Sequence, residues 1–359
     1  MKRMMALLIL LGLLLSGCSY WMNGSYSSVE PHIDPANHSG KPAVNVGSYE
    51  ELVSSLAAMV ENGAESGILS IQYDAADARV DMDKAIREVR QNNPFAIYAV
   101  EDIGYVLGAS GSRKAVSLQI NYLQNRERTN TIQRVQSLAQ VEQAVAQRLD
   151  ACATELVLYL ENQEQLNFAK MVADYSLLYP QRVMESPEVV VNLYPEQGEK
   201  QIVELKFIYQ SSQAQLRTLQ NRVAPVFSSA FQFVAGEWTT REKAERLYNF
   251  LMERYEYSIQ PSITPAYSLL LHGEGDSRAF AMVYAAMCRQ AKMECRVVSG
   301  TRQGEQWTWN AILIDGAYYY LDLLRCNDDG GFALHTQEEM VGYGWDQSAF
   351  VVQQEKTKK

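Results

Sequence analysis

The spacing of hydrophobic residues switches between two periods along the first half of the chain. From Ser48, apolar residues recur every three to four positions, as on one face of a helix, and β-branched runs with alternating polarity follow. Ser48 and Glu51 have the spacing of a capping box, which predicts a helix start. The predicted order is this helix, a strand at 68–73, a helix from Asp81 to a stop at Asn92-Asn93-Pro94, an interrupted strand at 95–106 and a strand at 114–123.

The same order of elements returns after about 87 residues. Helix patterns at 141–149 and 168–177 alternate with strand patterns at 155–160, 189–194 and 200–209. Pro94 and Pro180 are 86 residues apart, and Leu118 and Leu205 are 87 apart, so the apolar positions stay in phase. This predicts an α+β fold with two tandem α-β-α-β-β repeats, at 48–125 and 135–210, whose helices cover small antiparallel sheets. Chance likeness between amphipathic segments is the alternative.

The second half predicts a helical connector at 211–236 and a further domain at 220–350. Thr239 and Glu242 form a capping box, which predicts a helix ending near Tyr257. Farther on, Asp315-Gly316 separates two strand-like runs and is typical of a two-residue hairpin. With Ile314 opposite Ala317, positions 307 and 322 become diagonal neighbours on one face, about 7–8 Å apart at the backbone.

The first residues of the chain resemble an export signal. Lys2 and Arg3 precede an apolar run at 4–15, which is shorter than the roughly 20 residues of a membrane-spanning helix. The run ends in Leu15-Ser16-Gly17-Cys18, which resembles a bacterial lipobox. The resemblance implies a signal peptide at 1–17, cleavage before Cys18 and lipid attachment to its sulfur. An ordinary secretory signal is the alternative. Residues 18–47, rich in Ser, Gly, Asn and Pro, read as a flexible tether.

Composition narrows the classes of partner. The 359 residues carry a formal net charge of −10 and no long basic run, which argues against a nucleic-acid partner. With four histidines, no His/Cys cluster and no Gly-rich phosphate loop, the sequence predicts neither a metal site nor a cofactor.

Four segments of the second half occur in a characteristic order. They are Gly275-Asp276-Ser277 at a helix start, a strand at 295–300 ending in Gly, Trp307-Thr308-Trp309-Asn310, and Tyr319-Tyr320-Leu321-Asp322. Their order and spacing resemble the core of a transglutaminase-like domain of the papain-like superfamily, over about 220–350. The resemblance implies an α+β domain in which a Cys at a helix start, a His on a neighbouring strand and an Asp form a catalytic triad.

Two of these three reactive positions are substituted. Ser277 stands where the family has Cys, Trp307 stands where it has His, and Asp322 alone is retained. A serine hydroxyl needs a neighbouring base to become a nucleophile, and an indole N–H donates but cannot accept a proton. We therefore expect a pseudoenzyme. The alternative is an amide hydrolase or acyltransferase that uses Ser277, Asp322 and an unrecognised base, for which His272 and His335 are candidates, although surface or capping roles are commoner for both.

The cysteines other than Cys18 are expected to be structural. Cys288 lies on a predicted helix face with Phe280 and Tyr284, and Cys295 begins a core strand. Burial is the simpler expectation for this pair, and a disulfide between them is the alternative in an exported protein. Cys152 and Cys326 are expected to remain unpaired.

Several aromatic residues lie on the predicted hairpin. We expect Trp307, Trp309 and Tyr320 to line the former catalytic cleft, either as a binding surface or as side chains that fill it.

The sequence thus predicts an extracytoplasmic lipoprotein, anchored to the cell membrane or to the outer membrane of a two-membrane cell. Its C-terminal domain is expected to bind a peptide, a protein or a cell-envelope ligand, or to serve as a scaffold.

Overall fold

A computed structural model describes residues 43–75, 77–110, 113–123, 129, 131–161, 166–259 and 265–350. The chain folds as two compact units that divide after Arg126. In the described part, no helix has the length and apolar character needed to cross a membrane. Cys18, the signal segment 1–17 and most of the tether lie outside the described residues.

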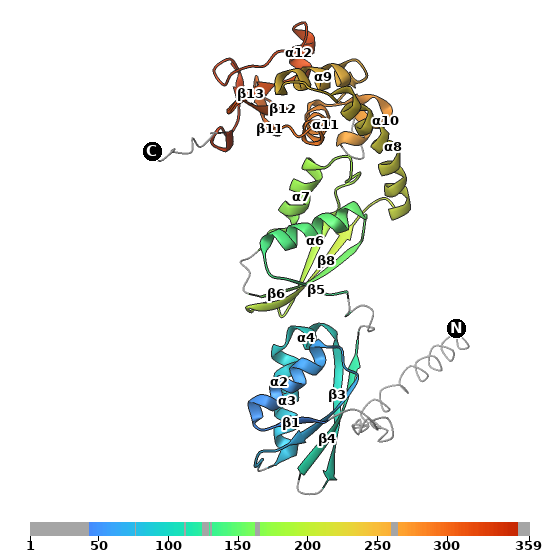
Figure 1. Ribbon diagram of the computed structural model, residues 1–359, viewed down its shortest axis with the longest axis vertical. Helices are drawn as coiled ribbons and strands as arrows, with labels where there is room; N and C mark the ends of the chain where they lie inside the picture. Colours follow the sequence, from blue (N-terminus) through green and yellow to red (C-terminus); the bar gives the residue numbers. More distant parts are fainter. Residues whose placement is uncertain are drawn as a thin grey trace, which may run out of the picture. The chain divides into compact units, whose positions relative to one another are not determined.

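The first unit is a four-stranded sheet with helices on one face (Figure 1). The sheet order is β1-β2-β4-β3, with β1 parallel to β2 and β4 antiparallel to both of its neighbours. Alternate residues of β4 are buried, as expected for a sheet covered on one side. The elements are β1 (Val44–Val46), α2 (Tyr49–Glu61), β2 (Ser66–Ile71), α3 (Ala78–Asn92), α4 (Pro94–Ala99), β3 (Val100–Ser110) and β4 (Arg113–Tyr122).

The second unit begins with a sheet of the same strand order and pairing directions, β5-β6-β8-β7. Helices α6 and α7 share a hydrophobic core with alternate residues of β6 and β8. The two sheets thus have a common topology, while the tandem repeat itself stays a prediction. The elements are β5 (Gln133–Val135), α6 (Leu138–Asp150), β6 (Glu155–Glu161), α7 (Phe168–Leu178), β7 (Glu188–Tyr194) and β8 (Lys200–Ile208).

The predicted strand at 95–106 was wrong in its first part. Residues Pro94–Ala99 form α4, because the Asn93 side chain caps the helix at the amides of Phe95 and Ala96, and Pro94 takes the first helical position. Helix α3 begins at Ala78 with Asp77 as its cap, earlier than the predicted Asp81. The short strands β1 and β5, three residues each, were not predicted because they are too short to show a period.

The rest of the second unit surrounds a central helix, α11 (Ser277–Gln290). Its buried residues pack against one face of the sheet β13-β12-β11-β14, and residues from the C-terminal segment pack on the other face. Helix α9 begins with the predicted capping box of Thr239 and Glu242, but it ends at Met252, before Tyr257. The elements are α8 (Gln213–Phe233), α9 (Thr240–Met252), β9 (Glu256–Tyr257), α10 (Pro265–His272), β10 (Glu274–Gly275), β11 (Cys295–Arg302), β12 (Glu305–Ile314), β13 (Ala317–Leu321), α12 (Leu323–Asp328) and β14 (Tyr343–Gly344).

The hairpin of β12 and β13 has the predicted register. Ile314 pairs with Ala317 and Asn310 pairs with Leu321. Asp315 and Gly316 both have positive φ, +49° and +83°, as a two-residue turn of this kind requires. On β12, the Asn310 side chain donates a hydrogen bond to the Ala281 carbonyl of α11, which places the even-numbered residues toward the helix. The odd-numbered Trp309 and Ala311 face the C-terminal segment, whereas Trp307, near the start of the strand, packs against residues on both sides.

Candidate functional site

The position of the family's nucleophile lies at the start of α11. Ser277 is the first helical residue and is 9% exposed, and the Asp276 carboxylate before it caps the helix by accepting from the Ala279 amide at 2.8 Å. Gly275 allows a close approach here, since a Cβ atom at this residue would lie 2.9 Å from the Cβ of Ala279. The backbone therefore presents residue 277 at a helix N-terminus, as the resemblance implied.

No described base forms a hydrogen bond with this hydroxyl. Within the described part of the chain, Ser277 Oγ has no hydrogen-bond partner. His272 ends α10 and packs its ring edge-on against Tyr267 with 5.5 Å between centroids, and the main chain of His335 pairs with that of Tyr320. Neither candidate histidine forms a hydrogen bond with Ser277 in the described part of the chain. Asp276 adds a negative charge next to the hydroxyl, which disfavours its ionisation.

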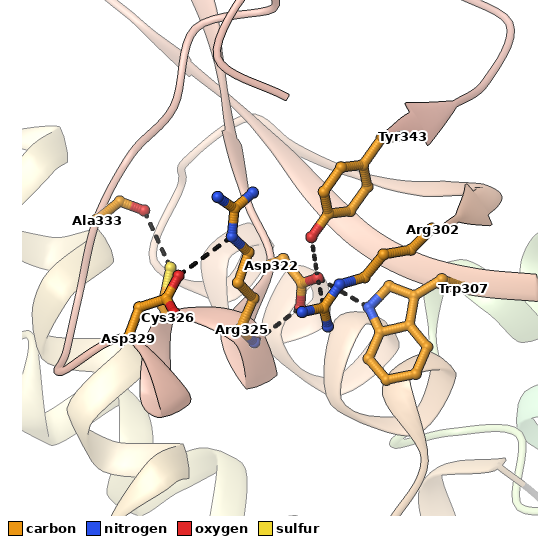
Figure 2. A network of polar contacts seen from close by, with 8 residues as sticks. All are labelled: Arg302, Trp307, Asp322, Arg325, Cys326, Asp329, Ala333 and Tyr343. Carbon is orange, nitrogen blue, oxygen red and sulfur yellow. Dashed lines mark hydrogen bonds and ion pairs between the residues drawn. The ribbon is translucent and has the colours of Figure 1, made fainter. Parts of the chain in front are cut away.

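Asp322 and Trp307 do meet, as the hairpin register predicted. Trp307 Nε1 donates a hydrogen bond of 2.8 Å to Asp322 Oδ2, and Tyr343 Oη donates another of 2.6 Å to the same oxygen (Figure 2). The Arg302 guanidinium lies 3.6 Å from Oδ2, and the other oxygen, Oδ1, accepts from the Arg325 amide at 3.2 Å. Asp322 is 1% exposed, so it is a buried charge with four partners.

The four partners come from four different elements. They lie on β11 (Arg302), β12 (Trp307), α12 (Arg325) and β14 (Tyr343), so the carboxylate joins the two inner strands and the edge strand β14 to the helix that follows β13. Burial, and then the hydrogen bond to Asp322, raise the pKa of Tyr343 above its ordinary value. The phenol therefore stays protonated and keeps donating through neutral pH. We call Arg302, Trp307, Asp322, Arg325 and Tyr343 the Asp322 network.

The chemistry open to this network is limited. In a triad the acid orients an imidazole whose second nitrogen accepts a proton. Here Asp322 holds an indole, which has no second nitrogen and can only donate. The arrangement fixes the position of Trp307 and stabilises the sheet, and it leaves no proton acceptor facing Ser277 among the described residues.

Two of the three aromatic residues predicted to line the cleft are core residues. Trp309 is 0% exposed and Tyr320 is 2% exposed, and both pack with Met340 and Trp345. The prediction that they offer binding surface was wrong, because the alternation of β12 and β13 turns them toward the C-terminal segment. Of the two roles considered for these rings, filling of the interior is the observed one.

Trp307 is only partly buried and forms part of an accessible surface. Its ring lies 5.9 Å from the ring of Tyr257, which is 48% exposed, and the Arg302 guanidinium lies 5.2 Å from the Trp307 ring centre. Tyr257 pairs in register with Gly275, two residues before Ser277. We call Tyr257, Arg302 and Trp307 the aromatic–arginine surface. Sequence reasoning missed Tyr257, Arg302 and Tyr343, because no motif links these three distant positions.

The four described cysteines are buried free thiols. Cys288 and Cys295 therefore do not form the disulfide considered from the sequence. Burial raises the pKa of the Cys152, Cys295 and Cys326 thiols, which is the opposite of what a reactive thiolate requires. No described group of three or more His, Cys, Asp or Glu side chains is placed to hold a metal ion.

Comparison with known proteins identifies the C-terminal domain. Residues 228–345 match the family model of the transglutaminase-like superfamily, so this part of the chain is a transglutaminase-like domain. No curated protein matches the chain in sequence.

Similar solved structures include a TGase with 8% identity and a TM-score of 0.27, over 63% of this chain and 66% of that one. A proposed protease from Parabacteroides distasonis has 12% identity and a TM-score of 0.24, over 72% and 40%. A proposed cysteine protease from Cytophaga hutchinsonii has 15% identity and a TM-score of 0.26, over 46% and 70%. This chain spans less than two thirds of the length of the first two.

Proposed function

From the transglutaminase-like domain at 228–345, we propose that the protein is a non-catalytic binding module that uses the remains of the family's active site. The observation that carries the proposal is the Asp322 network. Its carboxylate is occupied by Trp307, Tyr343, Arg302 and Arg325, while Ser277 has no partner in the described part of the chain. A site built this way holds its shape but lacks a base.

The aromatic–arginine surface supports binding in place of catalysis. Exposed tyrosine and tryptophan rings stack on sugars and on extended peptides, and a guanidinium next to them adds hydrogen-bond donors. Because the Asp322 network orients both Trp307 and Arg302, little freedom is lost when a ligand contacts them. We propose a peptide, a protein or a cell-envelope polymer as the ligand.

We further propose that the protein acts outside the cytoplasm on a lipid anchor at Cys18. The lipobox-like sequence and the short apolar run before it support this anchor. The polar segment from Cys18 up to β1 would then hold the domains away from the lipid surface; residues 44–46 belong to the first sheet and not to the tether. Mass spectrometry of the protein extracted from membranes tests the anchor. An acylated N-terminal Cys18 peptide is expected, and an unmodified Cys18 would contradict it.

Catalysis is tested with the full chain and its Ser277→Ala variant. We expect neither protein to release product from fluorogenic amide and ester substrates above the buffer rate, because no described residue accepts the Ser277 proton. Turnover by the natural chain that is lost in Ser277→Ala would instead support an enzyme that uses Ser277, and would overturn the proposal.

Binding is tested by co-sedimentation with insoluble peptidoglycan, and by capture on immobilised extended peptides. Trp307→Ala is expected to weaken retention about tenfold, in line with the loss of one stacking contact. Trp238→Ala is the matched control. This half-buried tryptophan stacks with Arg246, 3.5 Å from its ring centre, and lies outside the aromatic–arginine surface. Equal loss in both variants would contradict a specific role for Trp307.

A further inference from the structure

A second polar hollow lies inside the second unit, formed by residues other than those of the aromatic–arginine surface. It has a volume of about 750 Å³, within the range of ligand sites. Its walls come from the C-terminal end of α6, the loop after α7, the middle of α8 and the last turn of α11. The hollow therefore lies where the sheet β5-β6-β8-β7 and its helices meet the transglutaminase-like domain.

One side of the hollow is an aromatic ring flanked by two guanidinium groups. Arg182 lies 5.4 Å and Arg289 lies 5.0 Å from the centre of the Tyr179 ring. Arg182 is neutralised by Asp150, with 2.8 Å between Nη1 and Oδ2. Arg289 donates to the main-chain carbonyl of Leu178, and among the described residues it has no carboxylate partner. The hollow thus retains one positive charge.

The hollow also contains a buried hydrogen-bond acceptor that lacks a donor. The side-chain oxygen of Gln181 is buried in the hollow's wall and accepts no hydrogen bond from the described residues. An unsatisfied buried carbonyl oxygen costs about 1–3 kcal/mol, so such atoms normally have a partner. Ala224, Phe227 and Ala286 contribute an apolar part of the lining.

We propose that this hollow binds a short peptide through a free carboxylate. The carboxylate would accept from Arg289, and small side chains would rest on Ala224 and Ala286. The partly exposed Gln181 side chain would turn its buried Oε1 toward the peptide and accept from one of its main-chain N–H groups. A peptide terminus supplies both an anion and an amide donor, which are the two kinds of partner that Arg289 and Gln181 Oε1 lack among the described residues. This site is independent of the function proposed for the aromatic–arginine surface.

The test is a titration of the full chain with N-acetyl-trialanine and with its C-terminal amide, followed by saturation-transfer NMR. The free acid is expected to bind about tenfold more tightly than the amide, because only the acid forms a charge-assisted hydrogen bond with Arg289. No binding of the acid at millimolar concentration, or equal binding of acid and amide, overturns the proposal. Acetate that competes as well as the tripeptide overturns the assignment to a peptide.

Variants locate the contact. Arg289→Gln should remove the preference for the acid, while Arg222→Gln should retain it. Arg222 is the matched control because it is an exposed arginine of α8 that does not line the hollow, although its neighbour Asn221 does. A second variant, Gln181→Met, should weaken the acid and the amide by the same factor, so the proposal can be tested even when Arg289→Gln fails to fold. Wild-type binding by Arg289→Gln or by Gln181→Met contradicts the proposal.

Discussion

The Asp322 network and the hollow beside Arg289 are polar regions of the same unit, and they differ in how their polar groups are satisfied. In the network, a 1% exposed carboxylate has four partners at 2.6–3.6 Å. In the hollow, Gln181 Oε1 has no described partner, and Arg289 has no described counter-charge. The network has the satisfied hydrogen bonding of a structural element, whereas the hollow retains groups that a ligand can satisfy.

The difference is informative because the network occupies the positions at which the family places its chemistry. There, an indole and a phenol both donate hydrogen bonds to the buried carboxylate, so its polar contacts are those of a structural centre. The hollow, which no family motif marks, is the region with unused binding capacity. The position of the family's reactive residues therefore does not by itself indicate which region of the chain has unsatisfied polar groups.

The largest expected effect comes from Asp322→Ala. Removal of the carboxylate leaves Trp307 Nε1, Tyr343 Oη and Arg302 without their partner in a buried site, and we expect unfolding to require about 3–5 kcal/mol less. Urea unfolding of the full chain, followed by tryptophan fluorescence, measures this change. Asp329→Ala is the control, since its side chain is 64% exposed and pairs with Arg325 on the surface. Equal effects would show that the network is not a structural centre.

A smaller loss is expected for Tyr343→Phe. The variant keeps the ring that packs edge-on against Trp309 but removes the donor to Asp322. A hydrogen bond to a charged group contributes about 1.5–3 kcal/mol, and the same urea experiment should report a loss in this range. A neutral result would mean that solvent replaces the phenol, and that the network is more open than its burial indicates.

The pH dependence of this contribution follows from the raised pKa of Tyr343 in the folded chain. Above the unfolded value of about 10, the unfolded state loses the phenolic proton while the folded state keeps it. Stability from this group is therefore fully present below about pH 10 and is lost as the pH rises beyond it. The difference in unfolding free energy between the natural chain and Tyr343→Phe should be constant from pH 7 to 9 and shrink above about pH 10. A constant difference through pH 11 contradicts the assignment.

The smallest change in the free energy of unfolding is expected for Gln181→Met, and this variant should stabilise the chain or leave its stability unchanged. Gln181→Met keeps the length of the side chain but removes an acceptor that has no described partner. Because an unsatisfied group is removed, the free energy of unfolding should be unchanged or rise by up to about 1 kcal/mol. Thermal unfolding without added peptide measures this difference. A loss comparable to that of Tyr343→Phe would mean that the oxygen is satisfied in the free protein, which would weaken the comparison on which the ligand site rests.

Sequence reasoning was most successful where the signals were local. The Asp315-Gly316 turn and strand alternation predicted the pairing of β12 with β13, and with it the meeting of positions 307 and 322. It failed at Pro94–Ala99, where an asparagine cap and a proline begin a helix within a run that reads as a strand. Tyr343 and Arg302 were not predicted as partners of Asp322, since β14 reaches the site only through its pairing with β11.

The sequence by itself determined most of the order of the longer helices and strands, the hairpin register, and the absence of Cys and His from positions 277 and 307, because these depend on residue identity and on contacts between near neighbours. The tertiary structure decided which aromatic rings are buried, what surrounds the Asp322 carboxylate, and where polar atoms remain without partners. Those properties depend on which distant segments pack on each face of a sheet, and a period along the chain carries no information about the partner that will cover it.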